Sequence, residues 1–304
     1  MILAAYSVNL VQEIDDIEPY PDYYANIIQM KMHCDYEIDT RGFLKYWTNC
    51  FSYQYIGHDR IIPIMASVSI VYLVYVLANT ITNNRIIGLI SMAAMTQNQL
   101  LTKFDSSPTY DQVWVAFLLL SIVLLYKKPI IGLFTFPISI MSKILAVGYL
   151  PAMFANVIMD KRIKYRKITL IWLSVVSAIG ITTVSFLSVG SYIGFYPDRL
   201  LDGFLRIFES IWPIFPVVIG TIVIDRFFMP KEKPEGKKIV LVWLAWILLT
   251  TPLIYLFTQG QLQFGYRFVP FAAFFSIYFG ITCVQLGNFI TETRLRKHSL
   301  KSIS

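Results

Sequence analysis

The sequence predicts an all-α polytopic membrane protein with about ten membrane helices, and its composition and its apolar stretches both indicate this class. Hydrophobic residues make up 56% of the 304 residues and charged residues only 15%, whereas a soluble domain keeps about a quarter of its residues charged. Apolar stretches near the ~20 residues that a helix needs to cross the hydrocarbon core recur along the chain. Residues 1–304 are therefore expected to form a single transmembrane domain.

Seven of the predicted spans are single apolar stretches. With soft edges, they are 61–81, 86–101, 112–126, 168–189, 211–224, 239–257 and 268–287. Region 129–159 is apolar for too long to be one helix, and Pro137 and Pro151 interrupt it, so two short antiparallel helices that meet near Lys143 are expected. Residues 1–11 are apolar but too few to cross fully, and counting them gives ten membrane segments.

The distribution of positive charge predicts the orientation. Seventeen of the 26 Lys and Arg residues fall on one side if segment 61–81 runs inward and the later spans alternate. Because short loops rich in Lys and Arg face the cytoplasm, this side is expected to be cytoplasmic and to include the basic tail 288–304. The protein is thus expected to be integral to the cell membrane. Its net charge of +7 is explained by this asymmetry and by anionic lipid headgroups, without a nucleic-acid partner.

The same orientation makes residues 12–60 a long extracytoplasmic loop. Its aromatic content favours short amphipathic helices at the membrane interface, over 23–32 and 42–53. The loop also contains Cys34 and Cys50, and two interpretations are open. An oxidising exterior joins them, or they stay unpaired thiols within amphipathic helices.

Asp15 and Asp16 stand at the exit of the first apolar segment. A carboxylate near a low-dielectric boundary has a raised pKa, which suits a general base that takes a proton from a hydroxyl. The pair is also compatible with binding a divalent cation. The alternative is that acidic residues simply end a hydrophobic segment on the non-cytoplasmic side.

Lys143 and Arg267 are the candidate cations on the same face. Lys143 stands alone at the turn of the apolar hairpin, and Arg267 begins the last span directly after a polar loop. A cation at the membrane rim is a candidate site for a phosphate, which Lys binds as a point charge and Arg binds through two donors. The alternatives are a lysine that reaches the interface and an arginine that anchors a helix end.

Several short motifs follow one another in an order that resembles a known family. In chain order they are the pair Asp15-Asp16, the segment GHDR that ends at Arg60, the loop from Asp105 to Asp111, the pair Ser142-Lys143 at the turn of the hairpin, and the segment GYRFVP that contains Tyr266 and Arg267. This order resembles the GT-C-type integral membrane glycosyltransferases, which transfer sugars from polyprenyl-phosphate or polyprenyl-diphosphate carriers. The resemblance extends over residues 1–290 as a layout of parts.

The resemblance implies a GT-C-like fold and a role for each of these residues. Asp15 or Asp16 is expected to be the catalytic base, with Asp16 also a candidate metal ligand. Lys143 and Arg267 are expected to bind the carrier phosphate. The further candidates for binding the phosphate or the sugar are Arg60, Asp105, Asp111 and Tyr266.

The expected function is that of a hexosyltransferase on the extracytoplasmic face. It takes a polyprenyl-phosphate sugar as donor and a glycan, a lipid or a protein as acceptor. No cofactor is required, and a divalent cation, Mg²⁺ or Mn²⁺, is compatible with the residues. The alternative function is a non-catalytic subunit of a membrane complex or a transporter. A transporter is expected to place charged residues along a path within the spans, whereas the charges here lie at the span ends.

Overall fold

The computed structural model describes residues 1–12, 34, 48, 50–107, 112–186, 194–228, 235–257 and 265–301, and all regular structure in these ranges is helical. The prediction of an all-α protein is therefore confirmed for this part of the chain. Four of its helices are long and apolar enough to cross a membrane, namely Ile61–Thr82, Pro197–Phe227, Gly236–Phe257 and Val269–Thr293. Five further apolar helices in these ranges have 10–17 residues, so ten crossing segments stay a prediction.

Twelve α-helices follow one another along the described ranges. They are α1 (Ile2–Gln12), α4 (Ile61–Thr82), α5 (Arg85–Thr96), α6 (Gln99–Thr102), α7 (Val113–Lys127), α8 (Pro129–Ser142), α9 (Leu150–Met159), α10 (Arg166–Phe186), α11 (Leu200–Ile211), α12 (Phe215–Phe228), α13 (Glu235–Phe257) and α14 (Val269–Lys301). Short 3₁₀ segments connect several of them, and two matter below: η3 (Ile144–Tyr149) and η7 (Gly265–Phe268).

Local sequence signals explain where several helices begin and end. The turn between α4 and α5 uses two asparagines. Asn83 adopts a left-handed φ of 54°, and the Asn84 side chain accepts hydrogen bonds from the backbone N–H groups of Ile86 and Ile87. Pro129 begins α8, a position where the backbone N–H makes no hydrogen bond within the helix, so proline is tolerated.

The predicted break in region 129–159 is confirmed at Lys143. The backbone of this residue is extended between α8 and η3, and η3 leads directly into α9. α8 packs against α7 along the bundle, so the short helices replace one long span. Their junction lies beside the N-terminal residues of α7.

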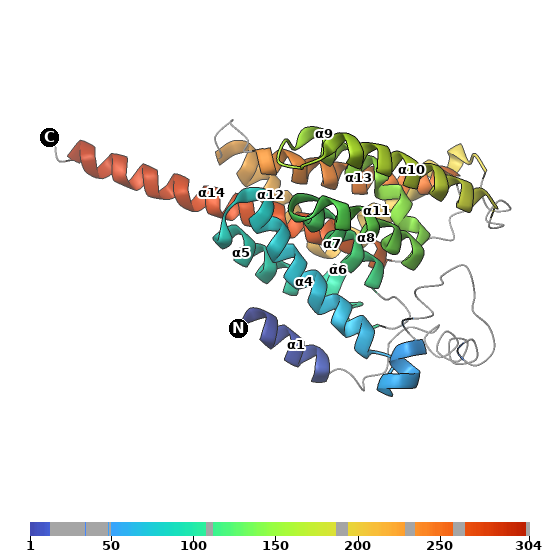
Figure 1. The fold of residues 1–304 in the computed structure, drawn as a ribbon. Helices are drawn as coiled ribbons and strands as arrows, with labels where there is room; N and C mark the ends of the chain where they lie inside the picture. Colours follow the sequence, from blue (N-terminus) through green and yellow to red (C-terminus); the bar gives the residue numbers. More distant parts are fainter. Residues whose placement is uncertain are drawn as a thin grey trace.

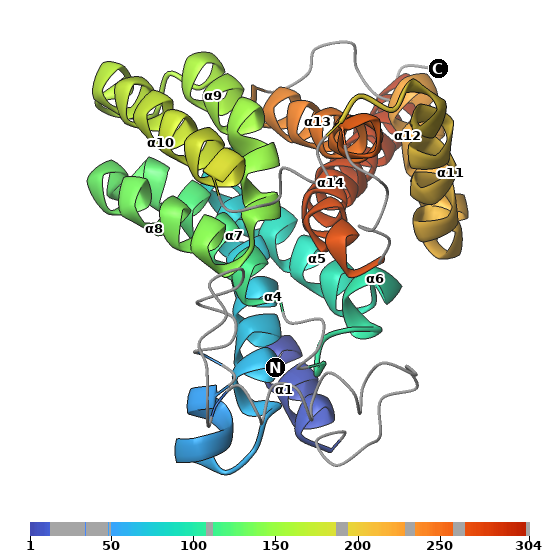
Figure 2. The same cartoon turned by 90° about the vertical axis from the view of Figure 1, so that its right-hand side faces the viewer.

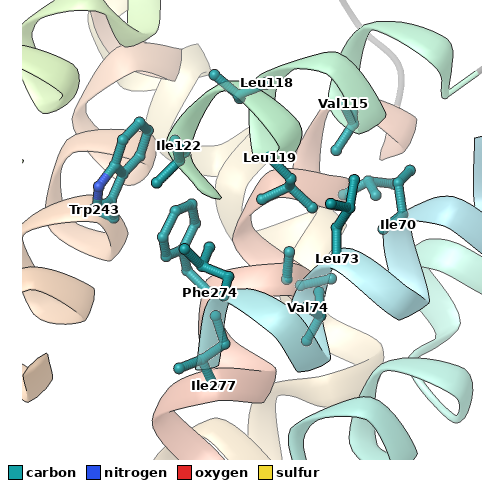
Figure 3. Close-up of a cluster of buried hydrophobic side chains, with 14 of the residues drawn as sticks. Ile70, Leu73, Val74, Val115, Leu118, Leu119, Ile122, Trp243, Phe274 and Ile277 are labelled. Carbon is teal, nitrogen blue, oxygen red and sulfur yellow. The ribbon is translucent and has the colours of Figure 1, made fainter. Parts of the chain in front are cut away.

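The centre of the bundle consists of α4, α5, α7 and α14, with α13 packed on α14. Figure 3 shows how side chains from α4, α7, α13 and α14 meet there. The Trp243 ring of α13 stacks on Phe274 of α14, with centroids 4.7 Å apart and 6° between the planes. Both rings are fully buried. This core fixes α13 and α14 relative to each other, and the candidate site lies at one end of these helices.

The remaining helices surround this centre. α1 lies at one edge of the bundle against α4, and α14 continues well beyond the other helices as far as Lys301 (Figure 1). α8 and α10 lie on one side of the centre, and α11 and α12 lie on the opposite side (Figure 2). α11 packs against α13, and α12 packs against α14.

The largest departure from the predicted boundaries concerns α11 and α12. The sequence predicts a span over 211–224, but the structure forms a longer, nearly continuous helical segment, Pro197–Phe227. α11 makes a close contact with α13. A Cβ atom on Gly203 would lie only 2.6 Å from the Cα atom of Pro252 in α13, so glycine allows α11 to lie directly on that helix. This contact holds the amphipathic helix α11 against the bundle.

At one end of the bundle, a buried polar network connects α12, α13 and α14. Lys237 is 2% exposed, and its ammonium group donates to the Asp225 carboxylate and, over 2.9 Å, to Gln285 Oε1. The Tyr278 hydroxyl donates to the other Asp225 oxygen at 2.7 Å. We call this the Lys237 end. The opposite end, where η7 leads into α14, is called the Arg267 end.

A second polar contact at the Lys237 end involves the loop between α9 and α10. Arg162 donates to both carboxylate oxygens of Asp160 and to the carbonyl oxygens of Thr80 and Ile81, near the C-terminus of α4. Burial raises the pKa of Asp160, but the hydrogen bonds from Arg162 outweigh this effect and hold the pKa below its usual value. Arg162 thus satisfies carbonyl groups that a helix end leaves without a partner.

Candidate functional site

A small cavity with both polar and apolar walls lies at the Arg267 end, between η3, η7, α11 and α13. Its volume is about 30 Å³. The residues that line it are Leu145, Tyr149, Arg206, Ser210, Thr250, Thr251, Ile254, Tyr255, Arg267 and Phe268. Two guanidinium groups, two phenols and three hydroxyls thus surround a space with room for only two or three water-sized groups.

Arg267 is positioned by the turn that precedes the longest helix. It belongs to η7, and the next two residues, Phe268 and Val269, are buried in the core at 5% and 0% exposure. This anchor holds the guanidinium group at the cavity, where its charge acts on the phenols of Tyr149 and Tyr255. The predicted candidate at the start of the last span therefore lines a cavity.

Arg206 reaches the same cavity from α11. The contact between Gly203 and α13 described above brings this helix close enough, and the charge of Arg206 also acts on Tyr255. Arg206 donates to Glu209 Oε2 over 2.7 Å on the same helix. Two arginines from distant parts of the sequence are thereby placed around one tyrosine.

A larger cavity of about 510 Å³ adjoins the small one. Arg206 and Ser210 line both. The full lining of the larger cavity is Gln99, Leu100, Thr102, Lys103, Phe104, Arg206, Glu209, Ser210 and Pro213. It therefore lies between α11 and the α6 region, and α11 forms the boundary between the two spaces.

Two aromatic rings connect Lys143 to the small cavity. Its ammonium group is 6.0 Å from the centroid of Trp114, and the Trp114 ring stacks on Tyr149 with centroids 6.0 Å apart. Tyr149 in turn lines the small cavity. Lys143 and Arg267, 124 positions apart in the sequence, are therefore brought to the same end of the bundle.

Two other predicted residues occupy neighbouring positions but line neither cavity. Asp105 is 4% exposed; one of its carboxylate oxygens accepts a hydrogen bond from the Tyr6 hydroxyl at 2.8 Å, and its backbone carbonyl accepts from Ser67. Arg60 is 3% exposed at the N-terminus of α4. The hydrogen bond between Tyr6 and Asp105 attaches α1 to the Arg267 end, so Asp105 has a structural role.

The other predicted residues fall outside what the structure describes. Asp15, Asp16 and Asp111 lie outside the described ranges, as does most of the loop 12–60 with its predicted helix 23–32. For Tyr266, only the backbone is described, within η7. Among the described residues, no group of three His, Cys, Asp or Glu side chains is placed to hold a metal ion.

The two cysteines of the long loop form a disulfide. The Cys34 and Cys50 sulfur atoms are 1.98 Å apart and the Cα atoms 5.4 Å. Of the two interpretations left open by the sequence, the joined one is therefore observed. Cys50 lies just before the short π-helix Ser52–Ile56, which leads towards α4.

Several site residues carry little signal in the sequence. Arg206 and Glu209 belong to an amphipathic pattern that indicates a helix on a surface, and nothing in this pattern places them at a cavity. Tyr149, Tyr255 and Trp114 have the appearance of ordinary aromatic residues in apolar segments. Gly203 is the one local signal for the close packing of α11, because a glycine within a helix often marks a close approach.

No protein-family model, no curated protein and no solved structure matches this chain. Function is therefore inferred from the chemistry of the site.

Proposed function

We propose that the protein is a membrane glycosyltransferase that transfers a sugar from a polyprenyl-phosphate donor to an acceptor hydroxyl on the extracytoplasmic face. One observation carries the proposal. Arg206 and Arg267 line one small cavity, and Lys143 adjoins it through Trp114 and Tyr149. The two arginines surround a space that can receive the charged oxygens of a phosphate group, and Lys143 lies beyond the two rings. The cavity lies at the end of apolar helices, beside which the tail of a lipid carrier fits.

The proposed chemistry is a direct displacement at the anomeric carbon. The acceptor oxygen forms a bond to this carbon, while the bond from the carbon to the phosphate oxygen breaks. Negative charge then develops on the departing polyprenyl phosphate, and Arg267, Arg206 and Lys143 stabilise it. Fixed cations at a site of developing charge lower the barrier because they need no reorganisation during the reaction.

The proton of the acceptor hydroxyl goes to Asp15 or Asp16, which follow α1 by a few residues. α1 is attached to the Arg267 end by the hydrogen bond between Tyr6 and Asp105, and this supports the assignment. If the enzyme uses Mg²⁺ or Mn²⁺, Asp16 is the proposed ligand. The displacement balances without a cation.

Two observations support the outward orientation of the Arg267 end. The disulfide between Cys34 and Cys50 lies in the loop that leads to this end of α4, and disulfides persist on the oxidising side of a membrane. The clusters of Lys and Arg lie at the opposite end or in the tail, as expected for cytoplasmic loops. In this arrangement the ten apolar segments serve as the membrane domain, and the carrier tail lies between them.

The test measures the release of radiolabelled sugar from polyprenyl-phosphate donors by the purified protein in lipid nanodiscs. We expect Lys143→Ala, Arg267→Ala and Asp16→Asn each to lower turnover by about a hundredfold or more, the typical effect of removing one charge-stabilising or proton-transferring group. Lys164→Ala is the matched control, because Lys164 is an exposed cation in the loop between α9 and α10. Thermal unfolding of each variant verifies that it is folded.

Wild-type protein that turns over no donor, with either a monophosphate or a diphosphate carrier, would overturn the proposal. That result would favour the non-catalytic subunit. Equal turnover of Lys143→Ala, Arg267→Ala and the control would show that these cations do not hold the leaving group.

A further inference from the structure

The larger cavity at the Arg267 end differs chemically from the small one. Three neutral side chains with hydrogen-bonding groups, Gln99, Thr102 and Ser210, contribute to its lining. Gln99 and Thr102 are exposed on α6, and Ser210 faces them from α11. An amide and hydroxyls offer both donors and acceptors, which matches a ligand whose groups also do both.

The charges around this cavity are balanced more evenly than those of the small cavity. Arg206 is paired with Glu209 over 2.7 Å, and the carboxylate of Glu209 has further acceptor capacity. The Lys103 ammonium group is 5.7 Å from the centroid of the Phe104 ring. With two cations, one carboxylate and three neutral polar side chains, this lining carries less net positive charge than the small cavity with its two arginines. Its mixture of donors and acceptors matches the hydroxyl groups of a neutral ligand better than a second anion.

Size separates the two cavities in the same way. A volume of about 510 Å³ falls within the range of small-molecule pockets, about 300–1,000 Å³. The volume of about 30 Å³ next to it excludes a sugar ring. Because Arg206 and Ser210 line both spaces, ligands in the two cavities lie on either side of the same turn of α11.

We propose that the larger cavity is a sugar-binding subsite that holds the acceptor, with Gln99, Thr102, Ser210 and Glu209 forming hydrogen bonds to its hydroxyl groups. The role as an acceptor site rests on the proposed transferase function. Sugar binding itself is inferred from the residues that line the cavity. The arrangement brings an acceptor hydroxyl beside the phosphate site, with Arg206 between them. The acceptor is accordingly a glycan or a glycolipid and not an unglycosylated peptide.

The test uses a cysteine as a reporter of occupancy. Thr102→Cys is introduced together with Cys283→Ser, which removes the free thiol among the described residues, and the protein is placed in lipid nanodiscs. The rate of labelling by a charged methanethiosulfonate is followed by mass spectrometry. The probes are the octyl glycosides of mannose, glucose, galactose and N-acetylglucosamine. Gln97→Cys is the matched control, because Gln97 is exposed five positions away and does not line the cavity.

We expect at least one glycoside to slow the labelling of Cys at position 102 about tenfold when its concentration is about ten times its Kd. Labelling at position 97 is expected not to change. Gln99→Leu, added to the reporter, should weaken the protection about threefold to tenfold, the effect of one hydrogen bond. Octanol and phosphatidic acid serve as probes of an apolar or anionic ligand, and protection by either of them alone would overturn the proposal.

Release of sugar from the donor by the wild-type protein is measured in parallel, so that the two proposals can fail separately. Donor turnover without protection by any glycoside would overturn the acceptor subsite and leave the transferase in place. Protection without turnover of any donor would leave a sugar-binding cavity and overturn its role as an acceptor site.

Discussion

The Trp114 ring stacks on Tyr149 with centroids 6.0 Å apart, and this stack separates the Lys143 ammonium group from the cavity lined by Arg267. Trp114 is 1% exposed and Tyr149 is 3% exposed. A buried aromatic pair thus lies between a half-buried cation and the small cavity.

Replacing Trp114 by Leu should affect the donor in the same way as removing Lys143. A cation over an aromatic face is stabilised by about 0.5–2 kcal/mol, and Leu offers no such face. We expect the KM for the donor to rise in Trp114→Leu and in Lys143→Ala, and the double variant to be no worse than Lys143→Ala alone. Trp114→Phe keeps a ring and should retain more affinity than Trp114→Leu. Fully additive losses in the double variant would mean that Trp114 does not position Lys143.

Trp243→Ala should strongly destabilise the bundle. The ring is fully buried and stacks on Phe274, and removing such a side chain costs about 3–5 kcal/mol. The measurement is thermal unfolding in detergent. Trp212→Ala is the matched control, because the Trp212 ring is 59% exposed and its removal should change the unfolding temperature little. Similar losses in both variants would contradict the assignment of the core to the interface between α13 and α14.

The buried pair of Lys237 and Asp225 gives a prediction about single and double replacement. Lys237→Met alone leaves the Asp225 carboxylate buried without its cation and should cost about 3–5 kcal/mol of unfolding free energy. Lys237→Met combined with Asp225→Leu removes both charges and should restore most of this stability. Both variants are compared with the wild type by thermal unfolding. A double variant less stable than Lys237→Met would show that the pair contributes more than it costs to bury.

The contact between Asp160 and Arg162 predicts a specific pH dependence. Because the pKa of Asp160 in the folded protein is lowered, its contribution to stability is present above the unfolded pKa of about 3.9 and is lost as pH falls through the lower folded value. The difference in unfolding temperature between wild type and Asp160→Asn should therefore be constant near neutral pH and shrink in acid. Asp198→Asn, at an exposed carboxylate, is the control. A difference that grows as pH falls would contradict the lowered pKa.

Several apolar helices could be predicted from the sequence because the length of an apolar stretch reflects the thickness of the bilayer. The stretch 61–81 coincides with α4 (Ile61–Thr82), and the break at Lys143 follows from the residues around it. The position of α11 could not be predicted in the same way. It depends on Gly203 lying against Pro252 of α13, a contact between residues that are 49 positions apart.

The site was predictable only in part, for a related reason. Lys143 and Arg267 stand out because each is a cation beside an apolar stretch, and the structure brings both to the same end. Arg206 and Tyr149 join them only through the packing of α11 and η3, which no local pattern encodes. The cavities themselves are products of tertiary structure.

α14 carries contacts at both ends of the molecule. Arg267 lies in η7, which leads into the first turn of α14. Tyr278 and Gln285 of the same helix belong to the Lys237 network, and the helix ends at Lys301. A helix of 33 residues is about 50 Å long and bends little. The residues around the small cavity and the Lys237 network are therefore joined by one continuous helix, so a shift of α14 along its axis moves both ends together.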